Sequence, residues 1–176
     1  MKVCGLHFNL YLALAVALTL ACGCRTASKK DKQISALRVH IEAVADPTGR
    51  IVPISVVRAS PVLVNIAINP ILTEANVVAA RVIQSPGGFA VEIKFDETGG
   101  WILEQYSASN PGKHFAIYGQ WGEKLKEGRW LAAPLIQHRI GDGLLAFTPD
   151  ADREEMDQFV LGFNNLAKKN KKDSFK

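Results

Sequence analysis

Hydrophobic and polar positions follow each other most clearly over residues 88–118. Between Phe89 and Phe95 apolar and polar side chains alternate, which is typical of a strand with one buried face. Asp96 then offers a helix N-cap, and Asn110-Pro111-Gly112 ends the helical segment that follows. Residues 115–118 predict a second strand. Because a strand that returns through a helix to a further strand forms a right-handed crossover, this stretch predicts a sheet with a helix laid on one face.

Four further strands are predicted before this stretch, at 36–45, 51–58, 62–68 and 77–83, and apolar and polar residues alternate in the first and third of them. The turn sequence Asp46-Pro47-Thr48-Gly49 predicts that the first two strands form a hairpin. Pro53 indicates that the second of them lies at a sheet edge, because proline cannot donate a backbone hydrogen bond. Residues 73–76 are expected to form one helical turn.

The rest of the chain predicts a polar loop, two strands and a closing helix. We expect a loop over 119–128, a strand over 130–140 that Pro134 interrupts, and a strand over 144–147. The last helix can be capped by Thr148 or Asp152, with acidic residues in its first turn. Its apolar residues have the spacing of a single buried stripe: Met156, Phe159, Val160, Phe163 and Leu166.

The front of the chain has the features of an export signal. No Lys, Arg, Asp or Glu lies between Lys2 and Arg25, and residues 10–21 are almost purely apolar. Small residues precede Cys22 and Cys24, so the segment resembles a bacterial lipoprotein signal with one of these cysteines as the lipidated residue. Cys22 is preferred, although neither cysteine follows a Leu at the third position before it. An uncleaved anchor is the alternative, since 22 uncharged residues could span a bilayer.

Charge is distributed unevenly along the 176 residues. The formal net charge is +4, which could suggest nucleic acid, yet residues 33–167 hold 11 Lys plus Arg against 15 Asp plus Glu. The positive excess lies in residues 25–32, whose composition is that of a flexible tether, and in residues 168–176. We therefore expect solvated basic tails and no nucleic-acid partner. A phosphate or anionic-lipid role for these tails is the alternative.

The composition narrows the chemistry available to one folded body. All three cysteines lie at or before position 24, so the body has no disulfide or thiolate metal site. His40, His114 and His138 are not at ligand spacing, and the acidic residues around 150–157 do not fit a calcium loop. No nucleophile motif or phosphate-binding loop occurs. We expect no metal, no cofactor and no catalytic residues. Gly99-Gly100 is interpreted as a close contact between helix and sheet.

Aromatic residues supply the candidates for a partner contact. Trp121 falls in the predicted polar loop, where a large apolar ring must either pack under the loop or bind a partner. Tyr118 and Trp130 lie on either side of the same loop. These three residues are the predicted partner-binding candidates, and burial of Trp121 is the alternative that the pattern favours.

With these elements placed, residues 70–164 resemble the head subdomain of the first periplasmic domain of SecD, an accessory subunit of the bacterial protein-export channel. The resemblance rests on local patterns in the right order. It is carried by a Pro, Leu-Thr and acidic pattern that starts at Pro70, by Phe95-Asp96-Glu97, by Asn110, Gly112 and Lys113, by Ala116-Ile117, by Ala133-Pro134-Leu135-Ile136 and by the helix from Asp152.

The resemblance implies an α+β fold outside the cytoplasm. It implies a mixed, mostly antiparallel sheet with two helices packed on one face, in the order β-β-α-β-β-α. The loop at 119–129, the shorter segment around Gly141 and the missing transmembrane helices of SecD depart from the family. The expected organisation is a signal peptide (1–21), a tether (22–35), N-terminal strands packing on the body (36–69), a SecD-head-like domain (70–167) and a basic tail (168–176).

These observations predict a non-catalytic lipoprotein held on a membrane by its N-terminal lipid, with its body in the periplasm or outside the cell. The resemblance implies that the head contacts exported polypeptide or another envelope protein. An exported enzyme, for example a hydrolase, is one alternative. A structural envelope lipoprotein is another.

Overall fold

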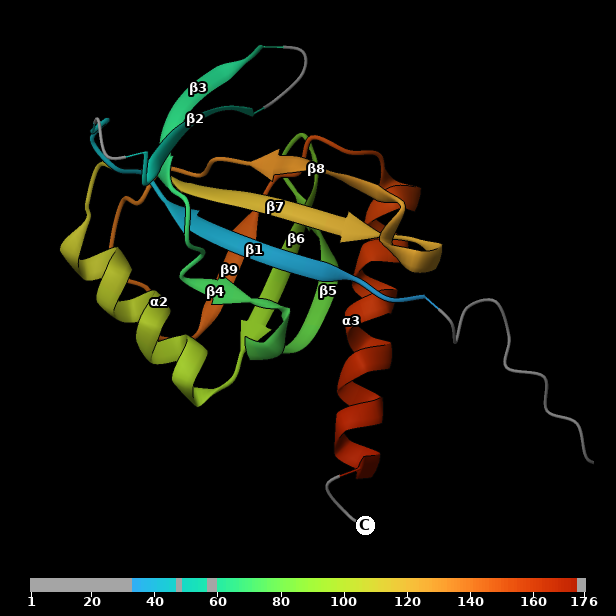
Figure 1. The fold of residues 1–176 in the computed structure, drawn as a ribbon. Helices are drawn as coiled ribbons and strands as arrows, with labels where there is room; N and C mark the ends of the chain where they lie inside the picture. The colour runs from blue at the N-terminus through green and yellow to red at the C-terminus, as the bar shows by residue number, and fades with distance from the viewer. Residues whose placement is uncertain (1–32, 47–48, 57–59, 174–176) are drawn as a thin grey trace, which may run out of the picture.

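The computed structural model describes residues 33–46, 49–56 and 60–173 (Figure 1). The predicted signal, Cys22 and Cys24 lie outside the described residues. Within the described part of the chain, no helix is both long and apolar enough to span a bilayer. The elements in chain order are β1 (Ala36–Ile41), β2 (Ile51–Val56), β3 (Val62–Ala67), β4 (Leu72–Thr73), η2 (Glu74–Asn76), β5 (Val77–Ser85), β6 (Gly88–Phe95), α2 (Glu97–Ser109), β7 (Phe115–Trp121), η3 (Glu123–Leu125), β8 (Glu127–Ala132), β9 (Leu144–Phe147) and α3 (Arg153–Asp173).

The fold is α+β, as expected. Its strands form three sheets with the orders β4-β1-β7-β8, β5-β6-β9 and β2-β3, and the strand pairs in all three are antiparallel. The four-stranded and three-stranded sheets enclose the main core, and α2 and α3 pack at its sides (Figure 1).

Strict alternation places one face of the four-stranded sheet in the main core. In β1, Leu37, Val39 and Ile41 face the core, while Arg38 and His40 lie on the opposite face. The same alternation in β7 sends Phe115, Ile117 and Trp121 inward. The inner face of this sheet therefore supplies much of the apolar surface that holds the body together.

The β2-β3 hairpin covers part of the opposite face and extends beyond the body (Figure 1). Val64 and Ile66 of the hairpin are buried against Ala116 of β7, and Trp130 packs at the edge of this cluster. A single bridge between Glu42 and Ile66 joins β3 to the chain just after β1. The hairpin thus forms a second, smaller hydrophobic cluster outside the main core.

Helix α2 begins where the sequence predicts it. The Asp96 carboxylate accepts a hydrogen bond from the Gly99 amide at 2.6 Å, which is the expected N-cap. A Cβ at Gly99 would lie 2.9 Å from the Cβ of Asn76, and Gly100 approaches the backbone of Gly143. The two glycines thus allow α2 to lie close to η2 and to the turn before β9.

Helix α3 is capped by Asp152, which accepts from the Glu155 amide at 2.9 Å while the Glu155 carboxylate accepts from the Asp152 amide. Its predicted apolar stripe is confirmed, because Met156, Phe159 and Phe163 are buried in the main core. The helix continues to Asp173, so residues 168–173, expected in a tail, are helical.

Two strands are fixed directly to α3. The Asn164 side chain accepts from the Ala80 amide at 3.3 Å and donates to the Ala80 carbonyl at 3.1 Å, which satisfies both outward backbone groups of Ala80 on edge strand β5. The Ser35 hydroxyl, next to β1, donates to the Phe159 carbonyl at 2.8 Å. Gly162 makes this approach possible, since a Cβ there would lie 2.7 Å from the backbone nitrogen of Ser35.

Three expectations about strands are wrong. β1 does not form a hairpin with β2. It pairs with β4 and β7, because its apolar face completes the main core. β6 and β7, expected to be joined by a crossover within one sheet, belong to different sheets. The strand expected over 130–140 ends at Ala132. The loop expected before it is also shorter, because β7 continues to Trp121 and β8 begins at Glu127.

Candidate functional site

Trp121, the first of the predicted partner-binding residues, is 1% exposed. It lies at the end of β7 and stacks edge-on against Phe159 of α3, with ring centroids 5.9 Å apart. The Arg129 guanidinium covers the ring at 5.1 Å and pairs with Glu155 of α3. Trp121 therefore packs α3 onto the sheet. The prediction that Trp121 contacts a partner at the surface is wrong, and the alternative prediction that its ring is buried is confirmed.

Tyr118 and Trp130, the other two candidates, lie together on the face of the sheet that carries the hairpin. Their rings meet edge-on at 5.2 Å, and Trp130 meets His40 in the same way at 5.5 Å. Both aromatic residues are half-buried and line a hollow of about 360 Å³ with Ser55, Pro61, Gly128, Arg129 and Asp150. They remain partner-contact candidates by position.

His40 is 6% exposed because the hairpin and Trp130 cover it. Its Nδ1 lies 2.8 Å from the Ala67 carbonyl and donates to it. Burial lowers the pKa of His40 more than this hydrogen bond raises it, and Arg38 lowers it further. The imidazole is therefore a neutral part of the hairpin contact.

His114 joins the end of β1 to the start of β7. Its Nδ1 lies 2.6 Å from the Glu42 carboxylate, which also accepts from the His114 amide at 2.9 Å. Within residues 33–46, 49–56 and 60–173, no three His, Cys, Asp or Glu side chains gather as metal ligands would. The pair of His114 and Glu42 serves to hold two strands together.

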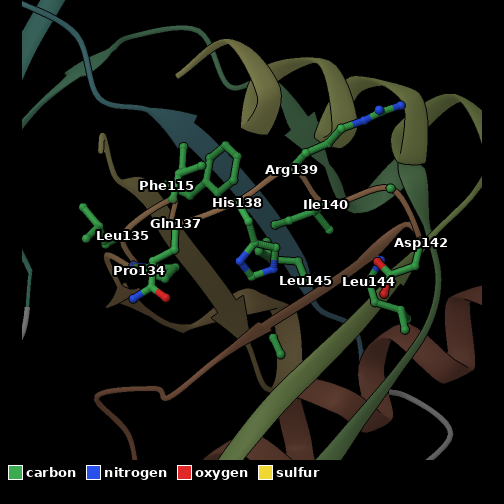
Figure 2. Close-up of a pocket in the computed structure, with 13 residues that line it drawn as sticks. Phe115, Pro134, Leu135, Gln137, His138, Arg139, Ile140, Asp142, Leu144 and Leu145 are labelled. Carbon is green, nitrogen blue, oxygen red and sulfur yellow. The ribbon is translucent and has the colours of Figure 1, made fainter. Parts of the chain in front are cut away.

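A larger hollow lies between strand β9 and the segment that connects β8 to it. We call it the β9 groove (Figure 2). Its volume is about 510 Å³. Its lining is mainly apolar, and His138 lies between its two sides in Figure 2. The Arg139 side chain points away from the groove and forms an ion pair with Glu104 of α2. The groove is lined by Phe115, residues 134–142 and residues 144–146.

The segment that forms the outer wall of the β9 groove is fixed at three points. The Ile136 amide donates to the Lys113 carbonyl at 2.8 Å, and the Ile136 carbonyl accepts from the Gly112 amide. The Ile140 amide donates to the Ser107 hydroxyl at 2.9 Å. The wall is thereby anchored to α2 and to the start of β7, so the groove is preformed.

Strand β9 lies at the edge of its sheet and turns backbone groups toward the groove. The Phe95 amide donates to the Gly143 carbonyl at 3.0 Å, and the register continues through Ile93 with Leu145. In an antiparallel ladder the hydrogen-bonding residues alternate, so the amide and carbonyl groups of Leu144 and Ala146 point away from β6. The Asp142 carboxylate accepts from the Leu144 amide, whereas the outward backbone groups of Ala146 have no hydrogen-bond partner among the described residues.

An exposed strand edge beside an apolar groove is suited to binding a polypeptide in an extended conformation. The backbone of the incoming segment pairs with the edge, and its alternate side chains enter the groove. Sequence reasoning predicted β9 itself but not this site, because the edge position of a strand depends on which distant strands pair.

Comparison with known proteins identifies the family. The family model described as SecDF, P1 head subdomain, matches residues 51–162. The chain belongs to this family. The match covers β2 through Gly162, in the middle of α3, so it includes the hairpin, the aromatic residues Tyr118 and Trp130, and the whole β9 groove.

One solved SecDF structure shares the fold of this chain. A structure of SecDF, described as a membrane component that enhances protein export, matches with a TM-score of 0.52 at 19% identity, over 78% of this chain and 65% of that chain. SecDF in a super-membrane-facing form gives 0.45 at 15% identity, over 91% and 33%. SecDF from Thermus thermophilus, described as translocon-associated, gives 0.39 at 15% identity, over 90% and 34%. This chain thus spans two thirds or less of these SecDF chains. No curated protein matches it.

Proposed function

We propose that this chain is a membrane-anchored protein of the cell envelope whose SecDF-type head binds extended polypeptide during protein export, without catalysing a reaction. Membership of the SecDF head family supports a role related to protein translocation. The lipoprotein-like segment at the front of the chain supports export and anchorage through Cys22 or Cys24. The partner is either an exported polypeptide or another envelope protein.

The observation that carries the proposal is the outward backbone of Ala146 beside the β9 groove. A sheet edge pairs with any sequence in an extended conformation, because it recognises the main chain. Apolar groove residues such as Leu135, which is 48% exposed, would contact the side chains of the bound segment. Such a site suits a partner whose sequence varies and whose chain is unfolded, as an exported polypeptide is.

Replacement of the edge donor tests this proposal. Ala146→Pro removes the outward amide without removing a hydrogen bond to β6, since proline is tolerated on edge strands. The matched control is Ala146→Ser, which keeps the amide. Binding is measured by the fluorescence anisotropy of labelled α-lactalbumin that has been reduced and carboxymethylated so that it stays unfolded. Native α-lactalbumin serves as the folded competitor.

Unfolded α-lactalbumin should bind the wild type and Ala146→Ser equally, and bind Ala146→Pro about tenfold more weakly, since a factor of ten corresponds to one or two lost hydrogen bonds. Circular dichroism checks that the variants fold. Equal affinity for a folded Ala146→Pro, or equal competition by native α-lactalbumin, would refute binding at the β9 edge.

Anchorage is tested separately by mass spectrometry of the mature N-terminus. A diacylglycerol-modified N-terminal fragment that begins at Cys22 or Cys24 is expected, and Cys22→Ser or Cys24→Ser identifies which residue carries the lipid. An unmodified chain that begins after residue 25 would contradict lipidation.

A further inference from the structure

The start of the described chain is attached to the middle of α3. The Asn165 amide group donates to the Gln33 carbonyl at 3.2 Å, and Ser35 contacts the helix at Phe159 and Gly162. In Figure 1, β1 begins beside α3. The chain therefore enters the folded body beside α3, one helical turn before Lys168 and Lys169.

Lysines of α3 continue from this contact. Residues three and four positions apart are neighbours on a helix surface, so Lys168 and Lys169 lie one turn beyond Asn165 on the side that Gln33 occupies. Both lysines are exposed. Lys171 and Lys172 follow in the last turn of the same helix.

The contact between Gln33 and Asn165 is flanked in the sequence by two basic runs. Residues 25–32, which end immediately before Gln33, have a net charge of +3, and residues 168–176 have a net charge of +4. Residues 33–167 have a net charge of −4. Lysines at the C-terminal end of α3 would by themselves only complement the helix dipole. That explanation does not account for the basic run that precedes Gln33.

We propose that the surface formed by the exposed Lys168 and Lys169 of α3, beside the chain entry at Gln33, is a docking surface for anionic lipid headgroups. The inference rests on the membrane anchorage proposed above for its geometry, and it goes beyond polypeptide binding. Eight residues separate Cys24 from Gln33, a chain that extends at most about 30 Å and averages about 15 Å when flexible. Basic residues held that close to a membrane are attracted to anionic lipids.

The consequence is a defined orientation. The acidic body is repelled by the same lipids that attract the basic end, so α3 would stand on the membrane with its C-terminal end down. The β2-β3 hairpin, which lies far from the C-terminal end of α3, would then face away from the membrane (Figure 1).

Photo-cross-linking of the full chain tests this docking. Asn170 is replaced by p-benzoylphenylalanine, and the protein is reconstituted into vesicles of phosphatidylcholine alone or with one third phosphatidylglycerol. Lipid adducts are measured by mass spectrometry at low salt and in 0.5 M NaCl. Lys168→Glu with Lys169→Glu reverses two charges at the proposed surface. Arg50→Glu with Lys113→Glu is the matched control. Arg50 directly precedes β2 and Lys113 follows α2, and Figure 1 shows both elements apart from the C-terminal end of α3.

Lipid adducts should be about tenfold more abundant with phosphatidylglycerol than without it, since each basic residue adds to the attraction. They should be lost in 0.5 M NaCl and in the Lys168/Lys169 variant, and retained in the control. Equal adducts in both vesicles, no effect of the Lys168/Lys169 reversal, or adducts with protein in place of lipid would overturn the proposal.

Vesicle flotation separates this result from a failure of anchorage. A protein that floats with both kinds of vesicle but gives equal adducts retains its anchor and refutes the docking surface. A protein that floats only with vesicles containing phosphatidylglycerol lacks the anchor and supports docking. A protein that floats with neither refutes both.

Discussion

Gly162→Ala should destabilise the protein although alanine is the better helix former. In the interior of a helix alanine is favoured over glycine by about 1 kcal/mol. At position 162, however, a Cβ would lie 2.7 Å from both the Ser35 backbone nitrogen and the Ile34 carbonyl carbon. Neither is the end of a flexible side chain, so α3 must move away from the start of β1.

The magnitude follows from what that movement costs. Overpacking of a close contact costs about 1–3 kcal/mol. Loss of the hydrogen bond from the buried Ser35 hydroxyl to Phe159 adds about 1 kcal/mol. After subtraction of the gain in helix propensity, the free energy of unfolding should fall by about 1–3 kcal/mol.

Urea unfolding followed by circular dichroism and tryptophan fluorescence measures this change. Gly100→Ala is the matched control, because Gly100 is also helical but a Cβ there would meet its nearest atom, the Gly143 Cα, at an ordinary 3.6 Å. That variant should keep or raise stability. A Gly162→Ala protein as stable as the wild type would show that α3 does not approach β1 as closely as described.

Other substitutions test the core, the caps and the buried histidine. Trp121→Ala should lower the free energy of unfolding by about 3–5 kcal/mol, whereas Trp101→Ala, at a residue 64% exposed, should change it by less than about 0.5 kcal/mol; urea unfolding of both distinguishes a packing role for Trp121 from a surface role. Asp96→Ala should lower it by about 1 kcal/mol through loss of the α2 cap, with Asp96→Asn nearly neutral in the same assay. Because burial lowers the pKa of His40, the unfolded state binds this proton more readily, so stability should fall as the pH drops below about 6.5. His40→Gln should flatten that part of a stability profile measured between pH 5 and 8, and an unchanged slope would contradict burial of a neutral imidazole.

Elements with strong local signals could be predicted from the sequence. The strict alternation of β6, the Asp96 cap and the stop at Asn110 describe β6 and α2 without reference to the rest of the chain. The stripe of α3 was equally clear, because its apolar residues recur on one helix face. The SecDF head family was recognised from these same elements.

Pairings between distant strands could not be predicted. Asp46-Pro47-Thr48-Gly49 has the residues of a hairpin turn, yet β1 pairs with β7, about 80 residues away, because its inner face must be buried in the main core. Local polarity also misled the assignment of residues 119–128. Every second residue from Phe115 to Trp121 points inward, including Ile117 and Gly119. This alternation could have predicted that the strand continues to Trp121.

The candidate site depends on the same missing information. Leu144–Phe147 was predicted as a strand from its composition, but its place at the edge of a sheet follows from pairing with β6. Ala146 has no sequence feature that marks its outward amide. The position of Lys168 and Lys169 beside the chain entry likewise depends on the contact between Gln33 and Asn165.

The pair of hydrogen bonds between the Asn164 side chain and the Ala80 backbone has a consequence for self-association. The edge strands of the three-stranded sheet are β5 and β9. Helix α3 covers the edge of β5, where the Asn164 side chain makes the two hydrogen bonds with Ala80 that a neighbouring strand would make. A sheet that can accept a strand at one end only cannot grow into a fibre, because each added chain would need a second open end to continue. Two copies joined through β9 would close the assembly as a dimer. One open end and one sealed end thus allow this sheet to receive a strand and prevent it from becoming a template for many.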